Sequence, residues 1–335
     1  MKKIILNTKI KLPIKKIKWG VAGCGHFAEH SFLPAVHISR RGKVTSIFSN
    51  NKQRAEQLAN KFSIANYFSD YEKFLASDID AVYISSANIN HYGQAIMAAN
   101  AGKHILCEKP ISMTSEQAKE IIKTCKKNNV QLSINYVMRY HPLILKAKEI
   151  INSRMIGKLT SINMSFNINL PPSENFRYNK KLSGGGALRD LGTHLIDLLL
   201  FFGGEIEQIN GGLDNLVFKE DVEDYAYATV KFKDLGYGNF NVSYCNKRAL
   251  NRIEILGTKG AITIDNFIGI KNETPKISIL LKNETKKVFR KRGNKMLYML
   301  RSVQKAFLKN KAPLVTGEDG YINLKLIEEL EKKCS

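Results

Sequence analysis

The pattern of hydrophobic and polar positions changes near residue 140. From residue 17 to residue 135, short apolar runs alternate with segments in which apolar residues recur every three or four positions. The runs predict strands and the segments predict amphipathic helices. Strands are predicted at 17–22, 44–48, 81–85, 104–107 and 130–135, and helices at 29–40, 52–62, 71–76, 91–101 and 115–128. This alternation indicates βαβ units and a doubly wound parallel sheet.

Beyond residue 140 the strand pattern dominates. Helices are predicted at 143–152 and, directly after Gly184, Gly185 and Gly186, at 187–202. Runs separated by Gly, Asp or Asn turns predict strands at 159–168, 222–233, 237–244, 251–257, 261–265, 276–281 and 286–290. Such runs are typical of antiparallel sheet. We therefore expect a second domain of different construction, followed by two helices at 296–309 and 319–332.

Positive charge is concentrated in two segments. The 335 residues include 52 Lys and Arg and 30 Asp and Glu, a formal net charge of +22, of which residues 1–18 carry +7 and residues 271–311 carry +11. Binding to nucleic acid or an anionic surface would depend on residues 1–18 and on the run 286–295. Neither segment contains an aromatic stacking platform or a recognition helix, so nucleic acid is not the expected partner. The same charge would attract an acidic substrate.

Two further features bear on location. The apolar stretch 195–202 is interrupted by Asp197 and is far shorter than the roughly 20 residues that a membrane span requires. The five cysteines form no C-x-x-C pair and no short metal-binding spacing, which suits free thiols in a reducing compartment. We expect a cytoplasmic protein with no membrane span and no bound metal.

A glycine-rich turn follows the first predicted strand and opens a helix. Residues 23–28 read G-x-G-x-x-A. Gly23 suits the tight turn, Gly25 allows a diphosphate to approach the backbone, and Ala28 allows close packing of helix and strand. The unpaired N–H groups of the helix would bind the diphosphate. The sequence therefore predicts a dinucleotide site that also includes His26 and Phe27.

The end of the second predicted strand bears on the type of dinucleotide. An NAD site usually has an acidic residue there, which binds the ribose hydroxyls. Here Ser49 and Asn50 follow the strand, and the first acidic residue is Glu56. Lys52 and Arg54 would suit a 2′-phosphate, although both are also compatible with a solvated helix surface. We assign Ser49, Asn50 and Arg54 to the cofactor site and favour NADP over NAD.

Two more motifs make the pattern specific. One is Glu108-Lys109-Pro110, after the fourth predicted strand, and the other runs from the three glycines through Asp190 to His194. Together with the glycine turn they resemble the glucose–fructose oxidoreductase/inositol dehydrogenase (Gfo/Idh/MocA) family, over residues 17–330. The resemblance implies a Rossmann domain followed by a domain with a large open, mostly antiparallel β-sheet.

The resemblance also divides the chain. It implies a dinucleotide-binding domain at 17–137 and a substrate and oligomerisation domain at 138–312, with the helix at about 313–331 packing back on the first domain. Residues 1–16 form a basic extension outside the family core. Members of the family commonly pair through the open sheet, so a homodimer or homotetramer is expected.

By position, Lys109, Asp190 and His194 correspond to the catalytic residues of the family. Pro110 would end the strand and place Lys109 at the carboxyl edge of the parallel sheet, where its charge could stabilise a developing alkoxide. Asp190 and His194 lie four residues apart, on one helical face if the helix is already formed at Asp190. Histidine could take or return the hydroxyl proton. Asp190 could bind a neighbouring hydroxyl or orient the imidazole.

The remaining assignments come from flanking motifs. Arg177 and Arg139 are assigned to the substrate together with the three catalytic residues, although Arg139 could instead fix the domain junction. The other residues assigned to the cofactor are Ser86, Asn88, His91, Glu108 and Lys109. The family usually has threonine–proline where this chain has Ser86 and Ala87, a change that could loosen the nicotinamide contact.

The expected activity is therefore that of an NAD(P)-dependent oxidoreductase. The resemblance implies hydride transfer between nicotinamide and a hydroxyl-bearing carbon of a sugar, sugar derivative, nucleotide sugar or cyclitol. The alternative is a non-catalytic dinucleotide sensor on the same fold, which would have no need of Lys109, Asp190 and His194. Binding of an anionic surface or nucleic acid through residues 1–18 and 286–295 is a third hypothesis.

Overall fold

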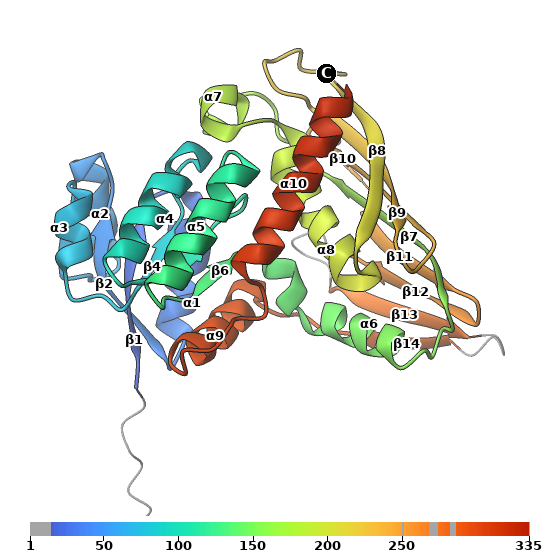
Figure 1. Ribbon diagram of the computed structural model, residues 1–335, viewed down its shortest axis with the longest axis horizontal. Helices are drawn as coiled ribbons and strands as arrows, with labels where there is room; N and C mark the ends of the chain where they lie inside the picture. Colours follow the sequence, from blue (N-terminus) through green and yellow to red (C-terminus); the bar gives the residue numbers. More distant parts are fainter. Residues whose placement is uncertain (1–14, 250, 268–273, 282–285, 335) are drawn as a thin grey trace, which may run out of the picture.

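The computed structural model describes residues 15–249, 251–267, 274–281 and 286–334, which fold around two β-sheets (Figure 1). The first sheet has the strand order β3-β2-β1-β4-β5-β6, and all neighbouring strands are parallel. Its strands are β1 (Ile17–Ala22), β2 (Gly42–Phe48), β3 (Asn66–Phe68), β4 (Ala81–Ile84), β5 (His104–Cys107) and β6 (Leu132–Ile134). The order reverses between β1 and β4, and doubly wound sheets bind ligands at the carboxyl ends of such strands.

Helices connect these strands, and several begin at side chains that cap them. Asn51, Asp70 and Thr114 each accept a hydrogen bond from the backbone N–H three residues further on, which satisfies a donor at the start of the helix. The elements are η1 (Ala28–Phe32), α1 (Leu33–Ile38), α2 (Lys52–Lys61), α3 (Tyr71–Ala76), η2 (Asn88–Asn90), α4 (His91–Asn100), α5 (Ser115–Lys127) and η3 (Val137–Tyr140). The short strand β3 has no counterpart in the sequence prediction, because three residues give no measurable alternation.

The second sheet has the order β14-β13-β12-β11-β7-β10-β9-β8, and only β7 and β10 pair in parallel among its described strands. These are β7 (Leu159–Asn167), β8 (Ile206–Asp214), β9 (Tyr225–Phe232), β10 (Tyr237–Ser243), β11 (Arg252–Gly257), β12 (Gly260–Asp265), β13 (Lys276–Leu281) and β14 (Lys286–Arg290). Buried residues alternate with more exposed ones along β9, so one face forms a core. The sequence prediction missed β8, whose Gly211 and Gly212 weaken the pattern.

Helices cover the inner face of this sheet (Figure 1). They include α6 (Pro142–Asn152) and α8 (Thr193–Gly203), whose apolar side chains belong to the second core. Shorter elements precede α8, namely η4 (Phe176–Tyr178), α7 (Lys180–Ser183) and the π-helical turn η5 (Leu188–Gly192). The fold class expected from the sequence, a parallel doubly wound sheet followed by a mostly antiparallel open sheet, is confirmed.

The last two helices connect the domains. The buried side chains of α9 (Lys295–Phe307), including Met299 and Leu300, belong to the first core, whereas the predicted bounds of the second domain, 138–312, include these residues. The apolar stripe of α9 faces α1 and η3, which explains the difference. The final helix α10 (Gly317–Cys334) contacts α5 of the first domain and also β8 and α8 of the second. Within the described residues, no helix combines the length and the apolar character that crossing a membrane requires.

Candidate active site

The glycine turn closes tightly against the end of β4. Gly23 has a φ of +101°, and a Cβ there would lie 2.6 Å from the backbone nitrogen of Ser86. A Cβ on Gly25 would meet only Ser85 O, at 3.9 Å. The backbone at Gly25 is therefore open for the close approach of a ligand, as a diphosphate requires. The turn also borders a cavity of about 320 Å³ that Ser49, Asn50, Arg54 and Ser86 help to line. These features fit a dinucleotide.

Arg54 helps to line this cavity, but its guanidinium is partly engaged. Its Nε donates to Cys24 O at 3.2 Å, and its Nη2 contacts a carboxylate oxygen of Glu29. Lys61 binds the other oxygen of Glu29 at 2.7 Å. The hydrogen bond from Lys61, with the added effect of Arg54, lowers the pKa of Glu29 to about 2. Two cations share one carboxylate, so the cluster keeps a net positive charge.

The loops after β4 and β5 are held together by a buried histidine. His91 Nδ1 lies 2.8 Å from the carbonyl oxygen of Pro110, and Nε2 lies 3.1 Å from that of Ser86. Burial lowers the pKa of the His91 imidazole. The ring therefore joins the two loops that carry Ser86 and Lys109.

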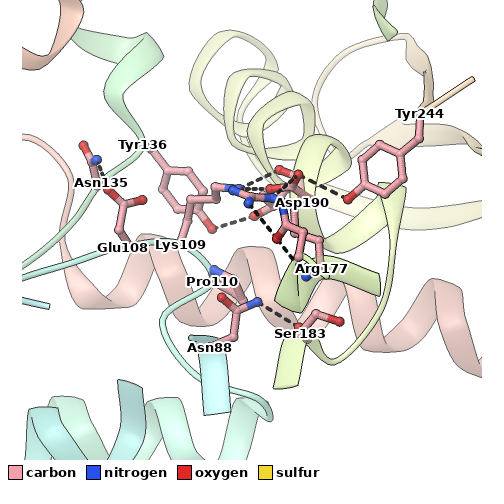
Figure 2. A network of polar contacts seen from close by, with 12 residues as sticks. Asn88, Glu108, Lys109, Pro110, Asn135, Tyr136, Arg177, Ser183, Asp190 and Tyr244 are labelled. Carbon is pink, nitrogen blue, oxygen red and sulfur yellow. Dashed lines mark hydrogen bonds and ion pairs between the residues drawn. The ribbon is translucent and has the colours of Figure 1, made fainter. Parts of the chain in front are cut away.

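Two other predicted cofactor residues make contacts within the protein. Glu108 accepts hydrogen bonds from Asn135 (Figure 2) and from Tyr83. Burial raises the pKa of its carboxyl group. Asn88 donates to the carbonyl oxygen of Ser183 at 2.8 Å (Figure 2). Because Ser183 belongs to α7, this bond joins the first domain to the segment before the three glycines.

Asp190 is the meeting point of three donors (Figure 2). Lys109 Nζ lies 2.6 Å from Oδ1 and 2.7 Å from the carbonyl oxygen of Asp190. Arg177 Nε donates to Oδ2 at 2.9 Å, and Tyr244 OH donates to the same oxygen at 3.2 Å. Burial alone would raise the pKa of Asp190, but the charges of Lys109 and Arg177 outweigh burial and hold it well below its usual range. Asp190 is therefore a carboxylate that fixes Lys109 in place.

The backbone before Asp190 depends on the three glycines. A Cβ on Gly186 would lie 2.0 Å from the carbonyl oxygen of Glu223. The Glu223 carboxylate accepts from the backbone nitrogens of Gly186 and Leu188, both at 2.9 Å. The chain then enters η5, so Asp190 lies in a π-helical turn rather than in the regular α-helix that the sequence predicts. Glycine at residue 186 thus permits the close approach that positions Asp190.

His194 lies in the first turn of α8, between aromatic rings. The ring centroids of Tyr136 and Phe166 are each 6.3 Å from that of its imidazole. Its Nδ1 is buried and has no hydrogen-bond partner among the described residues. Burial and then the charge of Lys109 lower its pKa well below the usual range, against the opposing effect of Asp190. The ring is therefore neutral, and His194 is not among the residues that line the cavities beside Lys109 and the glycine turn.

Arg139 is part of the domain junction. Its guanidinium contacts Asp197 of α8 at 2.7 Å through Nη2 and at 2.9 Å through Nε. It also contacts Asp319 of α10 at 2.9 Å. Arg139 follows β6 in the chain, so this buried network ties the first domain to α8 and α10. Of the two hypotheses for Arg139, these contacts support the fixing of the junction.

Comparisons with known proteins agree with this geometry. A family model described as "Oxidoreductase family, NAD-binding Rossmann fold" matches residues 17–136, and a model of the GFO/IDH/MocA C-terminal domain matches residues 144–263. The chain belongs to this family. Its curated relatives include "Oxidoreductase P35" of Formosa agariphila, 31% identical over 68% of this chain and 73% of the relative.

Other members match nearly the whole chain. A 1,5-anhydro-D-fructose reductase of Ensifer adhaerens is 28% identical over 92% of this chain and 93% of its own length. Among solved structures, an aldose-aldose oxidoreductase from Caulobacter crescentus in complex with glycerol has the same fold. Its TM-score is 0.88 at 21% identity, over 95% of this chain and 97% of that one.

The structure gathers most of the predicted residues of this family member at one place. A small cavity of about 90 Å³ is bordered by residues from both domains. Predicted residues among them are Gly25, His26, Phe27, Ser86, Asn88, Glu108, Lys109, Arg177 and Asp190. Ser49, Asn50 and Arg54 border the neighbouring cavity, and Ala28 is buried at the start of η1. Arg139 and His91 lie in the supporting structure instead.

Sequence reasoning missed Tyr244 and Glu223, which hold Asp190 and the segment before it. Tyr244 directly follows strand β10, and Glu223 lies in the loop before β9. Neither belongs to a motif with a recognisable spacing. Only the pairing of β9 with β10 and the close approach of residue 223 to the glycines bring them to the site.

Proposed function

We propose that this oxidoreductase acts on a hydroxyl-bearing carbon of a sugar, sugar derivative, nucleotide sugar or cyclitol at the junction of Lys109 and Asp190. The contact of 2.6 Å between Lys109 Nζ and Asp190 Oδ1 carries the proposal, because it joins the two domains beside His194. The sugar-type names of its relatives support it. The dinucleotide supplies or accepts the hydride when bound. The side chains transfer the hydroxyl proton and stabilise the charge on the reacting oxygen.

Each of the three residues has a distinct part. The Lys109 ammonium hydrogen-bonds the reacting oxygen and stabilises the negative charge that develops on it. The His194 imidazole is neutral, so it can take the hydroxyl proton during oxidation and return it during reduction. Asp190 contacts Lys109, Arg177 and Tyr244 rather than the imidazole. Its part is to hold the two cations in position.

For the cofactor we propose NADP over NAD. The diphosphate would lie on the turn from Gly23 to Ala28, and Ser49, Asn50 and Arg54 would bind the adenosine ribose. No acidic side chain follows β2 before Glu56. The cluster of Arg54 and Lys61 with Glu29 keeps a net positive charge, which suits a 2′-phosphate.

The division of the chain and its assembly remain predictions. We propose that residues 17–137 form the dinucleotide-binding domain and that the open sheet belongs to the substrate and oligomerisation domain. A homodimer or homotetramer would form through the outer face of that sheet, which no other described element covers (Figure 1).

The proposal is tested by removing Lys109. Purified protein is titrated with NADH and NADPH by fluorescence, and turnover is then measured over a panel of sugars and cyclitols. We expect NADPH to bind more tightly than NADH, and Lys109→Ala to lose at least about 100-fold in kcat. Full turnover by Lys109→Ala, or cofactor binding with neither oxidation nor reduction of any sugar or cyclitol tested, would contradict the catalytic assignment.

A further inference from the structure

Asn323 occupies a core position of α10 that is otherwise apolar. It is completely buried. An asparagine there is unfavourable in two ways, because it is a poor helix former and because a buried amide is costly unless it is hydrogen-bonded. The bonds that its amide makes therefore indicate why the helix carries it. The other buried residues of α10 are two glycines and Leu324, Leu326, Ile327 and Leu330.

The Asn323 amide bonds twice to one residue, Thr193 of α8. Its Oδ1 accepts from the Thr193 hydroxyl at 2.8 Å, and its Nδ2 donates to the Thr193 carbonyl oxygen, also at 2.8 Å. Thr193 is completely buried as well. Two bonds to one residue fix both the distance and the orientation between α10 and the start of α8. The Thr193 carbonyl belongs to the peptide bond that joins Thr193 to His194, so Asn323 holds the backbone at His194.

Tyr136 extends this contact to the segment that follows the parallel sheet. Its hydroxyl lies 3.0 Å from Thr193 Oγ1. Because the Thr193 hydroxyl gives its hydrogen to Asn323, Tyr136 is the donor in this bond. The ring of Tyr136 meets the His194 imidazole edge to face, with 6.3 Å between the centroids. Tyr136, Thr193 and Asn323 therefore form a buried chain of hydrogen bonds beside His194.

The position of the His194 imidazole depends on its backbone and on packing. Its Nδ1 is buried and has no hydrogen-bond partner among the described residues. The rings of Tyr136 and Phe166 pack on it, each with its centroid 6.3 Å away. Packing of rings is less directional than a hydrogen bond. The bonds from Asn323 to Thr193 therefore supply directed contacts that fix His194 at its backbone.

We propose that Asn323 is a positioning residue for His194 and acts through Thr193. The inference rests on the proposed function, in which His194 takes or returns the hydroxyl proton. Proton transfer requires the base to lie about 2.6–3.2 Å from the reacting oxygen. A displacement of about 1 Å can lower the rate about 100-fold. Asn323 is not among the residues that border the cavities beside Lys109 and the glycine turn, so its effect on the reaction passes through Thr193.

The experiment compares four variants. Asn323→Leu removes both bonds with a side chain of similar size, Thr193→Val removes the hydroxyl, and Thr193→Ser keeps it. Ser133→Ala is the matched control, because it removes a buried hydrogen bond of 2.9 Å to the carbonyl oxygen of Val315, between β6 and the segment before α10. Turnover of a sugar or cyclitol from the panel is measured with saturating cofactor, at a temperature at which circular dichroism shows every variant folded.

We expect Asn323→Leu and Thr193→Val to lower kcat about 10- to 100-fold and to change KM by less than about threefold, because substrate is bound but the base is misplaced. Thr193→Ser and Ser133→Ala should stay within about threefold of the unaltered protein in both constants. If Asn323→Leu and Thr193→Val match Ser133→Ala in kcat, the inference is overturned. An equal loss in Thr193→Ser would also overturn it, because that result assigns the effect to packing of the threonine methyl group.

The titration of His194 is a second readout that does not depend on activity. Burial is the main cause that lowers the pKa of its imidazole. In Asn323→Leu and Thr193→Val the ring should be less firmly buried, so its pKa, measured by NMR with His194→Gln to assign the signal, should rise. Ser133→Ala should leave this pKa unchanged. An unchanged pKa in Asn323→Leu and Thr193→Val would overturn the inference, because the imidazole would then keep its place without these bonds.

Failure of this inference is separable from failure of the proposed function. If Lys109→Ala and His194→Gln lose turnover but Asn323→Leu keeps it, only the positioning role of Asn323 is excluded. If Lys109→Ala and His194→Gln keep full turnover, the catalytic assignment fails. The NMR titration then still shows whether Asn323 holds the imidazole in place.

Discussion

At the scale of single residues, the site is organised by charge placed in a buried environment. Asp190 holds Lys109 and Arg177, and the same cations keep its carboxyl group ionised. The His194 imidazole is instead kept uncharged, because burial and the nearby ammonium of Lys109 both disfavour its protonation. In the proposed mechanism the Lys109 ammonium would stabilise charge on the reacting oxygen, and together with burial it keeps the His194 imidazole neutral.

This arrangement predicts how His194 titrates. Its pKa lies below the ordinary value of about 6.5, so the ring should stay neutral as the pH falls past that value. Lys109→Gln removes one positive charge and should raise the pKa. The chain has seven histidines, so NMR titration of labelled imidazoles, with His194→Gln to assign the signal, measures both values. An unchanged pKa in Lys109→Gln would show that Lys109 does not act on the ring.

The same shift has a consequence for stability. The unfolded chain takes up a proton at His194 near pH 6.5, whereas the folded protein does not. The free energy of unfolding should therefore fall as the pH drops below about 6.5. Above that pH, His194 is neutral in both the folded and the unfolded chain and causes no loss of stability. Raising the pKa in Lys109→Gln weakens this pH dependence.

The chemical residues were more predictable from sequence than the residues that support them. Lys109, Asp190 and His194 belong to motifs with fixed spacing. Tyr244, which directly follows strand β10, contacts Asp190 from 54 positions away in the chain. The role of Arg139 also could not be decided from the sequence, because its sequence context is compatible with two roles. Only the positions of Asp197 and Asp319 favour one of them.

At the scale of secondary-structure elements, the helices and strands with a strong apolar periodicity were predicted correctly, and those with a weak periodicity were missed. The parallel strands and long helices of the first domain follow their apolar patterns, but the short β3 and the glycine-containing β8 do not. The segment before α8 shows a subtler difference. The apolar pattern of 187–202 predicts a helix, but the helix begins with the π-helical turn η5. A π-turn is defined by its backbone hydrogen bonds, which the spacing of apolar residues does not reveal.

The entry into η5 can be tested at Gly186. Gly186→Ala would place a methyl group 2.0 Å from the carbonyl oxygen of Glu223, so the backbone must shift. We expect a loss of about 1–3 kcal/mol in the free energy of unfolding, measured with urea, together with reduced turnover as Asp190 moves. Gly93→Ala in α4 is the control, because a Cβ there meets nothing within 4 Å. That variant should be about 0.5–1 kcal/mol more stable. Equal effects of both substitutions would contradict the packing argument.

At the scale of the whole molecule, the two domains are joined by helices and by buried charge. The helix α10 places Leu324 in the first core and Leu330 in the second. Arg139 links the end of the parallel sheet to Asp197 and Asp319 on two helices. Because Lys109 and Asp190 come from different domains, their contact depends on these junctions. The candidate active site therefore depends on how the two domains are arranged.

Arg139→Met tests this junction. Removing the guanidinium leaves Asp197, which is buried, without its partner, and breaking a buried ion pair typically costs about 3–5 kcal/mol. Lys146→Met, which breaks the exposed pair with Glu149, should cost about 0–1 kcal/mol. Urea unfolding at pH 8 compares the two variants.

The pH dependence separates lost charge pairing from lost packing. Burial raises the pKa of Asp197 and Arg139 opposes that rise, so Arg139→Met should raise the pKa further. The folded variant then binds a proton that the unfolded chain releases above about pH 4, and its stability must fall as the pH rises towards the folded-state pKa. The cost of Arg139→Met should accordingly be smaller at pH 5 than at pH 8. A cost independent of pH would mean that Arg139 joins the domains by packing alone, and that its ion pair with Asp197 adds nothing to the junction.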